Sequence, residues 1–576
     1  MNVERLKTDI LIVGSGGAGL FAALHAHKAN PDLDITVASK GLLGKCGCTR
    51  MVQGGYNVAL NPGDSIERHF MDTIEGGKWL PHQELAWTLV STAVERVREL
   101  ENEIGCFFDR NPDGTLHGKA FAGQTFDRTV HKGDLTGIEI INRLMEQVWA
   151  RPIRRLEEHR AVALIPATDG ALSGVLMIDV RSGEFRFVAA QAVLLATGGG
   201  PTMYRYHTPS GDKSMDGLAM ALRLGLPLRD MEMVQFHPTG LLAGPDTRMT
   251  GTVLEEGLRG AGGHLLNGAM HRFMGDYDPK LERATRDVVS RAIYAEMRAE
   301  RTTPNGGVYI KMGHLGPANV AKQFKGMVDR CRDCGFDLAG GLVEVVPTAH
   351  YFMGGVVCGV DASTERFGLF VAGEDASGMH GANRLGGNGV ANSTVFGGIA
   401  GDVMPSFIAK NPGHRPPDTA VLDAEVERAL HPFSRKPGDL NRLREKLLDT
   451  MWDEVGVVRD RASIARGLAG IDAIEAELLA TGLADTGRRF NLTWHDWLNL
   501  RSLCEVSRVI ALAALRRENS RGAHYRSDFP EPGELATSTF TVARHISGRI
   551  EMTERPVVFS HVKPGQTLLR DAIAAE

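Results

Sequence analysis

The chain has 576 residues, of which 43% are hydrophobic and 23% charged, and a formal net charge of −5 at pH 7. These values fit a soluble globular protein of about three to four domains, and the lack of any basic run argues against a nucleic-acid partner. Seven cysteines over this length do not form the pattern of a disulfide framework, and no segment has the length and hydropathy of a membrane span. We therefore expect a cytoplasmic protein of a reducing compartment.

A glycine-rich turn follows the first predicted strand. The apolar run at 10–13 has strand character, and a helical pattern begins a few residues later. In such a turn the first glycine allows a tight bend, the second lets backbone N–H groups approach a pyrophosphate, and the last lets the helix pack on the strand. The turn contains Gly14, Ser15, Gly16, Gly17, Ala18 and Gly19. The pattern predicts a bound dinucleotide.

The second predicted strand, 35–38, ends in Ser39 and Lys40 rather than in an acid. A nicotinamide dinucleotide would require Asp or Glu at this position to bind the ribose 2′-OH. The sequence therefore disfavours NAD and favours FAD.

A small-residue loop at 41–60 has a composition that suits contact with a flat ligand. Its two cysteines, Cys46 and Cys48, would supply only two of four zinc ligands, so we interpret them as thiols in a tight loop. Helical patterns follow within 65–110 and from Thr136 to about Ala150.

A second strand-to-glycine turn is predicted near residue 196. The apolar run that begins at residue 192 ends in Ala196, Thr197 and Gly198, followed by two further glycines. Two such turns in one chain indicate that a large dinucleotide is bound at two places.

Several longer motifs follow in a fixed order. They are His237-Pro-Thr-Gly, Glu255-Glu256-Gly-Leu-Arg259-Gly, Thr285-Arg286-Asp287, Pro347-Thr-Ala-His350, Gly373-Glu374, His380-Gly-Ala-Asn-Arg384-Leu-Gly-Gly-Asn388 and Arg517-Glu-Asn-Ser-Arg-Gly-Ala-His524. With these motifs the chain, from about residue 8 to about residue 560, resembles the flavoprotein subunit of succinate dehydrogenase and fumarate reductase and the related L-aspartate oxidase.

The resemblance implies an α/β fold. A Rossmann-like FAD-binding domain, 1–240 and 346–410, would be interrupted by an α+β capping domain, 241–345. A helical domain, 411–530, and a small C-terminal tail domain, 531–576, would follow. The helical periodicity within 440–515 agrees with this division, and closure of the cap would exclude water from the reacting carbons.

The resemblance also implies FAD as the cofactor and marks the residues that would bind it. These are Gly14, Gly16, Gly17, Ala18, Gly19, Ser39, Lys40, Cys48, Thr49, Gln53, Gly54, Gly55, Ala196, Thr197, Gly198, Asp216, Glu374, Arg384 and Asn388.

The implied reaction is hydride transfer between flavin N5 and a small carboxylic acid. Arg286 would carry the proton, with Glu256 and Arg259 as relay partners. Substrate contacts would come from Phe121, His237, Glu255, His350 and Arg384. Two alternatives stay open: amine oxidation like that of L-aspartate oxidase, and a flavin electron-conduit subunit of a larger complex acting on a different substrate. No metal site is expected.

The chain has no iron–sulfur cysteine motif of its own. If the chain belongs to a multi-subunit enzyme, another chain, such as an iron–sulfur subunit, would have to carry the electrons away, and it could hold the protein at the periphery of a membrane.

The chain departs from the family pattern at the position that carries the covalent flavin in the membrane-bound enzymes. Cys48 stands where those enzymes have a histidine, before Thr49 and Gln53. FAD would then be non-covalent, which we favour, or attached as a cysteinyl thioether at Cys48.

A second departure concerns the substrate. The family has Thr where this chain has Glu255. The Thr hydroxyl donates to the substrate's distal carboxylate, whereas an ionised Glu can only accept. Either the substrate carries a neutral, hydroxyl or cationic group there, or Glu255 turns away or pairs with a nearby arginine.

Overall fold

The computed structural model describes residues 3–244 and 247–569. Its largest sheet has the strand order β6-β2-β1-β9-β8-β7, with β16 also paired to β9. Strands β6, β2, β1, β9 and β16 run parallel, while β8 and β7 extend the sheet antiparallel. Their bounds are β1 Glu4–Val13, β2 Ile35–Ala38, β6 Arg154–Leu156, β7 His159–Pro166, β8 Leu172–Asp179, β9 Phe185–Leu195 and β16 Leu369–Val371.

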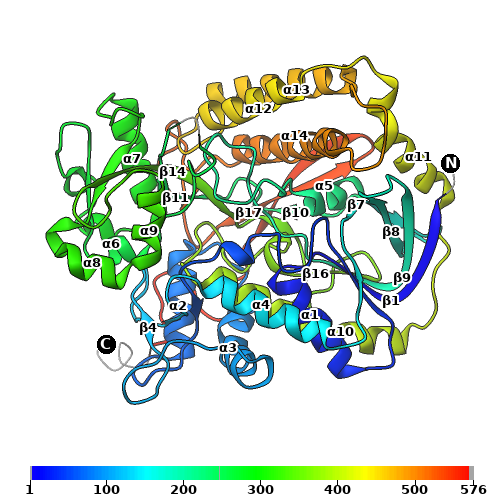
Figure 1. Ribbon diagram of the computed structural model, residues 1–576, viewed down its shortest axis with the longest axis horizontal. Helices are drawn as coiled ribbons and strands as arrows, with labels where there is room; N and C mark the ends of the chain where they lie inside the picture. The colour runs from blue at the N-terminus through cyan, green and yellow to red at the C-terminus, as the bar shows by residue number, and fades with distance from the viewer. Residues whose placement is uncertain (1–2, 245–246, 570–576) are drawn as a thin grey trace.

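Helix α1 (Gly17–Ala29) follows the first glycine-rich turn and packs closely against α10 (Asn388–Lys410). It also contacts α4 (Thr136–Trp149), which lies beside it in Figure 1. The predicted strands at 10–13 and 35–38, and the helix from Thr136, are therefore confirmed. Helices α2 (Ile66–Gly76) and α3 (Gln83–Glu99) occupy the predicted helical stretch.

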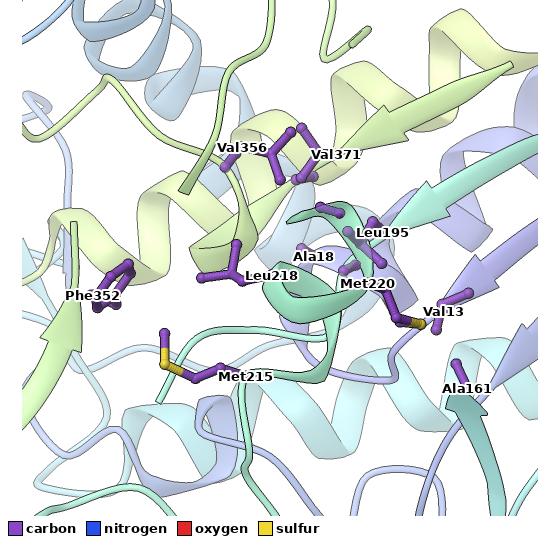
Figure 2. Close-up of a cluster of buried hydrophobic side chains, with 14 of the residues drawn as sticks. Val13, Ala18, Ala161, Leu195, Met215, Leu218, Met220, Phe352, Val356 and Val371 are labelled. Carbon is purple, nitrogen blue, oxygen red and sulfur yellow. The ribbon is translucent and has the colours of Figure 1, made fainter. Parts of the chain in front are cut away.

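The hydrophobic core reaches to the carboxyl ends of the parallel strands. Figure 2 shows Val13 of β1, Leu195 of β9 and Val371 of β16 in one buried cluster with Leu218 and Met220 of α5 (Asp216–Arg223). Ligands of open α/β sheets bind beyond these ends. Both glycine-rich turns follow directly from this packed layer.

A second sheet has the order β11-β14-β13-β12 and a separate core that includes Phe273, Ile293 and Val343. With its helices it forms the lobe at the left of Figure 1. The elements are β11 Val234–Leu241, α6 Gly257–Gly260, β12 His264–Leu266, α7 Arg286–Arg298, β13 Val308–Lys311, α8 Pro317–Gln323, α9 Lys325–Asp333 and β14 Leu342–Phe352. The long strands β11 and β14 pair antiparallel and join this lobe to the rest of the molecule.

Three long helices form a layer along the top of Figure 1. They are α12 Leu440–Glu454, α13 Arg461–Ala480 and α14 Leu492–Arg516, and the shorter α11 (Thr419–Leu430) precedes them. Their buried side chains, Trp494 among them, belong to the same core as the large sheet. The boundaries predicted for the helical and capping domains remain predictions.

The C-terminal hairpin, β17 (Thr539–Ile546) and β18 (Arg549–Pro556), completes a small sheet with the order β15-β10-β17-β18. The strands β10 (Leu228–Arg229) and β15 (Gly355–Val356) come from the body of the molecule. A fourth, three-stranded sheet joins β3 (Tyr56–Asn57), β5 (Thr129–Val130) and β4 (Gly118–Lys119). Within 3–244 and 247–569, none of the helices combines the length and the hydropathy that a membrane span requires.

Candidate active site

In the first glycine-rich turn, one glycine borders space that a ligand could fill, whereas two others are packed tightly against the backbone. A Cβ on Gly14, whose φ is +119°, would lie 2.0 Å from the Ala196 carbonyl oxygen, and one on Gly19 would lie 1.9 Å from the Gly14 oxygen. At Gly16 the nearest atom, Thr49 Oγ1, would be 3.4 Å away. Gly14 and Gly19 therefore serve the close packing of the chain, whereas Gly16 borders open space at the start of α1.

That space belongs to a cavity of about 370 Å³. It runs from the glycine-rich turns to the predicted substrate residues. Among the predicted cofactor residues, it is lined by Gly14, Gly16, Gly17, Ala18, Ser39, Lys40, Cys48, Thr49, Gln53, Gly54, Gly55, Ala196, Thr197, Gly198, Asp216, Glu374 and Arg384. Among the others, it is lined by Phe121, His237, Glu255, Glu256, Arg286 and His350.

The residues present fit FAD. The wall at Gly16 is open, and Gln53 Oε1 lies buried in the cavity wall without a hydrogen-bond partner in the described part of the chain. Buried polar atoms in proteins are nearly always paired, so an unpaired one in a cavity points to a polar ligand. FAD is the implied ligand: its pyrophosphate matches a glycine-rich turn, and its flat isoalloxazine ring matches the polar chamber joined to that turn.

Three predicted site residues do not line the cavity: Gly19, Arg259 and Asn388. Asn388 is fully buried, and its side chain forms hydrogen bonds with Asn57 and Thr73. Its Oδ1 also lies 2.9 Å from His69 Nε2. Its side chain therefore fixes the start of α10 rather than reaching the cavity. Contact of Asn388 with the cofactor stays a prediction.

Lys40 and Asp216 form an ion pair at the cavity wall, with 3.0 Å between Lys40 Nζ and Asp216 Oδ2. Arg160 binds the other oxygen of Asp216 at 2.7 Å. Burial opposes the charge on Asp216, but Arg160 and Lys40 hold the pKa of this carboxyl well below its usual range. Burial also lowers the pKa of Lys40 to about 8.

A buried ionic cluster occupies the far end of the cavity. Arg286, the first residue of α7, donates to Glu256 Oε2 from Nη2 at 2.6 Å and from Nε at 3.1 Å. Glu256 Oε1 accepts from Arg259 at 3.0 Å. Burial alone would raise the pKa of Glu256, but the two guanidinium groups lower it, so the carboxylate is ionised.

Arg384 stands beside this cluster. Gln235 Oε1 accepts from Arg286 Nη1 at 3.0 Å and from Arg384 Nη2 at 3.2 Å. Burial and the neighbouring Arg286 lower the pKa of Arg384 to about 10, and its Nε has no partner among the described residues. The guanidinium is therefore charged at neutral pH and free to bind a carboxylate.

His237 and His350 face each other, with ring centroids 5.3 Å apart. Nδ1 of His237 accepts from the Thr239 N–H at 3.3 Å, and Nδ1 of His350 lies 2.8 Å from Thr208 Oγ1. Burial, together with Arg286, holds the pKa of both imidazoles well below the ordinary value. Both rings are therefore neutral, and the ring proton of His237 is on Nε2, where it can be donated to a ligand.

Glu255 stays in the cavity wall. It is 2% exposed, so it does not turn away into solvent, and its ionic partner is Lys119, at 3.5 Å, rather than an arginine. Its Oε1 has no hydrogen-bond partner within the described residues. Burial, against the opposing attraction of Lys119, raises the pKa of Glu255 to about 7.

Cys48 also lines the cavity, and both it and Cys46 are free thiols. Burial raises the pKa of Cys48 to about 12. The side chain is therefore a neutral thiol at neutral pH, and the thiolate is the nucleophilic form of cysteine.

Sequence reasoning missed Gln235, Thr208 and Lys213. Gln235 stands two residues before His237 on β11, and this spacing could have placed it beside the predicted ligand. Lys213 lines the cavity and donates to the Thr197 carbonyl at 2.7 Å. Nothing in the local sequence around Thr208 or Lys213 marks either residue.

Comparison with known proteins shows similarity along almost the whole chain. Residues 9–390 match the FAD binding domain family, and residues 444–568 match the family described as fumarate reductase flavoprotein C-term. The chain is 33% identical over 582 residues to the fumarate reductase flavoprotein subunit of Mycobacterium tuberculosis, covering 97% of this chain and 98% of the relative. It is 33% identical over 546 residues to the fumarate reductase flavoprotein subunit of Escherichia coli, covering 91% and 89%.

Solved structures agree with these matches. A quinol-fumarate reductase with menaquinol molecules superposes with a TM-score of 0.92 at 31% identity, covering 98% of this chain and 100% of that chain. Sdh1 of Mycobacterium smegmatis, in complex with UQ1, gives a TM-score of 0.85 at 34% identity, covering 96% and 94%.

Proposed function

Because the chain belongs to the FAD-dependent flavoprotein family of fumarate reductase and succinate dehydrogenase, we propose that it reduces fumarate or a closely related dicarboxylic acid. It is an FAD-dependent oxidoreductase of the fumarate reductase type. The observation that carries the proposal is the placing of Arg286, Arg384, His237 and His350 in one buried cavity that continues to the glycine-rich turns.

The chain's own residues bind the acid and move the proton. The Arg384 guanidinium binds one carboxylate in two places, and neutral His350 and His237 donate to carboxylate oxygens. Arg286 delivers a proton to the substrate carbon and recovers it through Glu256, which also contacts Arg259. FAD, when bound, supplies the hydride chemistry. The buried walls exclude water from the reacting atoms.

We propose that the electron partner is an iron–sulfur subunit. The described residues contain no group of three or more His, Cys, Asp or Glu side chains that could hold a metal ion, so another carrier must deliver the electrons that reduce the substrate. Large apolar side chains lie exposed around α4, and one of them, Met51, also lines the cavity. They are Leu42, Met51, Phe107, Leu135 and Trp149. This surface suits a protein partner, which would place the flavoprotein in the cytoplasm at the periphery of a membrane.

A second candidate is oxidation of an amino acid such as L-aspartate. It is favoured by Glu255, since an ionised carboxylate in the cavity wall suits a substrate ammonium group. A flavin electron-conduit subunit of a larger complex, inactive alone, is the third alternative, and activity of the isolated chain with an artificial dye separates it from the other two.

The test is anaerobic titration of the reduced, FAD-loaded protein. Fumarate is expected to reoxidise the flavin promptly, and succinate to reduce the oxidised flavin or an artificial dye slowly. Reduction of the oxidised flavin by L-aspartate but not by succinate would instead assign the protein to the amine oxidases. Failure of fumarate, succinate and L-aspartate alike, with flavin bound, would contradict the proposal.

A further inference from the structure

Glu255 reaches the cavity from the chain segment beside β11. The Leu254 N–H donates to the Thr239 carbonyl at 2.9 Å, and Thr239 Oγ1 donates to the Leu254 carbonyl at 2.8 Å. Glu255 is therefore held next to the strand that carries His237. Both side chains line the same cavity, so one ligand group can meet both.

The cavity to which Glu255 belongs is also lined by hydrogen-bond donors. Arg286, Arg384 and His237 present N–H groups, which suit a ligand rich in acceptor oxygens. Glu255 Oε1 is a buried oxygen without a partner among the described residues. An ionised oxygen there would repel a carboxylate, whereas a protonated one would donate to it and be satisfied by it.

The charged groups that face Glu255 are of both signs. Lys119 of β4 lies 3.5 Å from Oε2, and Lys119 also donates to the Gly133 carbonyl at 2.7 Å. Asp134, which precedes α4, and the adjacent Glu256 both disfavour a second negative charge. Arg330 of α9 lines the cavity and donates to the Val253 carbonyl. Burial and the two acids outweigh Lys119, which leaves the pKa of Glu255 at about 7.

We propose that Glu255 binds the substrate's distal carboxylate as a neutral carboxylic acid, so that binding of a dicarboxylate takes up one proton. The inference rests on the proposed function, because it assumes a substrate with two carboxylates. It assigns to Glu255 the donor role that a Thr hydroxyl would fill without any protonation step. The consequence is a dicarboxylate affinity that depends on pH near neutrality.

The direction of the effect follows from the proton balance. Below pH about 7 free Glu255 already carries its proton, so ligand binding does not change the number of protons on the protein. Above it, the ionised carboxylate must be protonated before the dianion can bind, so the dissociation constant rises about tenfold per pH unit. Proton uptake approaches one per bound dianion at pH about 8.

The experiment is anaerobic calorimetric titration of the reduced, FAD-loaded protein with succinate from pH 6 to 9, because succinate cannot transfer a further hydride to a reduced flavin. Each pH is measured in two buffers of different ionisation enthalpy, so that the number of protons taken up is obtained without any turnover. Flavin absorbance reports binding independently. Glu255→Gln and Glu255→Thr are titrated in parallel, because both replace the acid by a neutral hydrogen-bond donor. Butanoate, with a single carboxylate, is the control ligand.

The expected result is proton uptake and a tenfold slope in the wild-type protein with succinate, and neither with butanoate. Both should vanish in Glu255→Gln and Glu255→Thr, which should bind succinate about tenfold more tightly than the wild-type protein at pH 8. Uptake that persists in Glu255→Gln would assign the proton to another group, Glu374 among them, and overturn the inference.

Two further outcomes separate the inference from the proposed function. If the two variants bind succinate and the wild-type protein does not, even at pH 6, Glu255 excludes dicarboxylates; the inference is overturned and the chemistry of the family is retained. If none of the three proteins binds a dicarboxylate while FAD is bound, the proposed function itself fails.

Discussion

Arg286 holds Glu256 through two donors on one carboxylate oxygen, with Nη2 at 2.6 Å and Nε at 3.1 Å from Oε2. Both side chains are buried. A buried pair of this kind fixes the direction of the guanidinium, and removing one partner leaves a charge without compensation. The geometry of Arg286 is therefore set by the lobe that carries it and not by a ligand.

The first prediction concerns Arg286→Lys, which keeps the charge and loses the planar fork. Lysine cannot contact Glu256 twice and Gln235 once, so proton delivery should fail, and kcat for fumarate should fall by about 100-fold or more. Flavin content should not change. Steady-state kinetics with a reduced dye measures the effect. Arg298→Lys, exposed at the end of the same helix, is the matched control and should leave kcat unaltered. An Arg286→Lys enzyme with normal kcat would remove Arg286 from the proton path.

Gln235→Leu tests the shared acceptor. Gln235 Oε1 binds both Arg286 and Arg384, and its Nε2 donates to Asn383 and to the Arg384 carbonyl. Leucine has a similar size but no acceptor, so each guanidinium loses a buried partner at about 1–3 kcal/mol. We expect KM for fumarate to rise about tenfold as Arg384 loses its orientation, and the free energy of unfolding to fall. Unchanged KM would mean that Gln235 supports the fold alone.

Alanine substitutions at two glycines of the first turn are expected to cause different defects. Gly14→Ala places a Cβ 2.0 Å from the Ala196 oxygen at a φ of +119°, so the protein without FAD should already be destabilised. The new Cβ of Gly16→Ala lies no closer than 3.4 Å to any other atom. Without FAD, this variant should therefore unfold at the wild-type temperature. Its FAD affinity should nevertheless fall by at least about tenfold, because the methyl group occupies the pyrophosphate approach. Thermal unfolding and fluorescence titration with FAD distinguish the two. Normal FAD binding by Gly16→Ala would place the pyrophosphate elsewhere.

Cys48 is predicted to leave FAD non-covalent. The thiol is buried and its pKa is raised to about 12, so the nucleophilic thiolate is scarce at neutral pH. Acid precipitation should release all flavin into the supernatant, and Cys48→Ala should retain its flavin. A yellow pellet that becomes colourless in Cys48→Ala would demonstrate the thioether instead.

Local sequence patterns are sufficient to predict the strands and the helix around the first glycine-rich turn. The apolar run at 10–13, the glycines and the following helical period predict the end of β1 and the start of α1, and the apolar run at 35–38 predicts β2. Each of these features depends on residues within a few positions of one another. The steric demand at Gly14 and Gly19 is likewise local, although the atoms that enforce it include Ala196 from the second turn.

The partners of charged side chains cannot be predicted in the same way. The sequence leaves two readings of Glu255 open, that it faces the substrate or that it turns away or pairs with an arginine. Its ionic partner is Lys119, 136 positions distant. Asn388 is expected at the cofactor, and its side chain bonds to Asn57 and Thr73. Such contacts join segments that lie far apart in the chain, and one short motif does not specify which polar groups will face each other.

By itself, the sequence determined the FAD-binding architecture, the order of its motifs and the identity of the arginines and histidines that line the cavity, because these depend on local spacing and on a pattern that spans the chain. Only the tertiary structure decided the protonation states of the side chains that line the cavity. Burial makes His237 and His350 neutral, and it brings the pKa of Glu255 to about 7 despite Lys119. The physical reason is that desolvation and Coulomb forces act through space, so a residue's charge depends on what the fold packs around it.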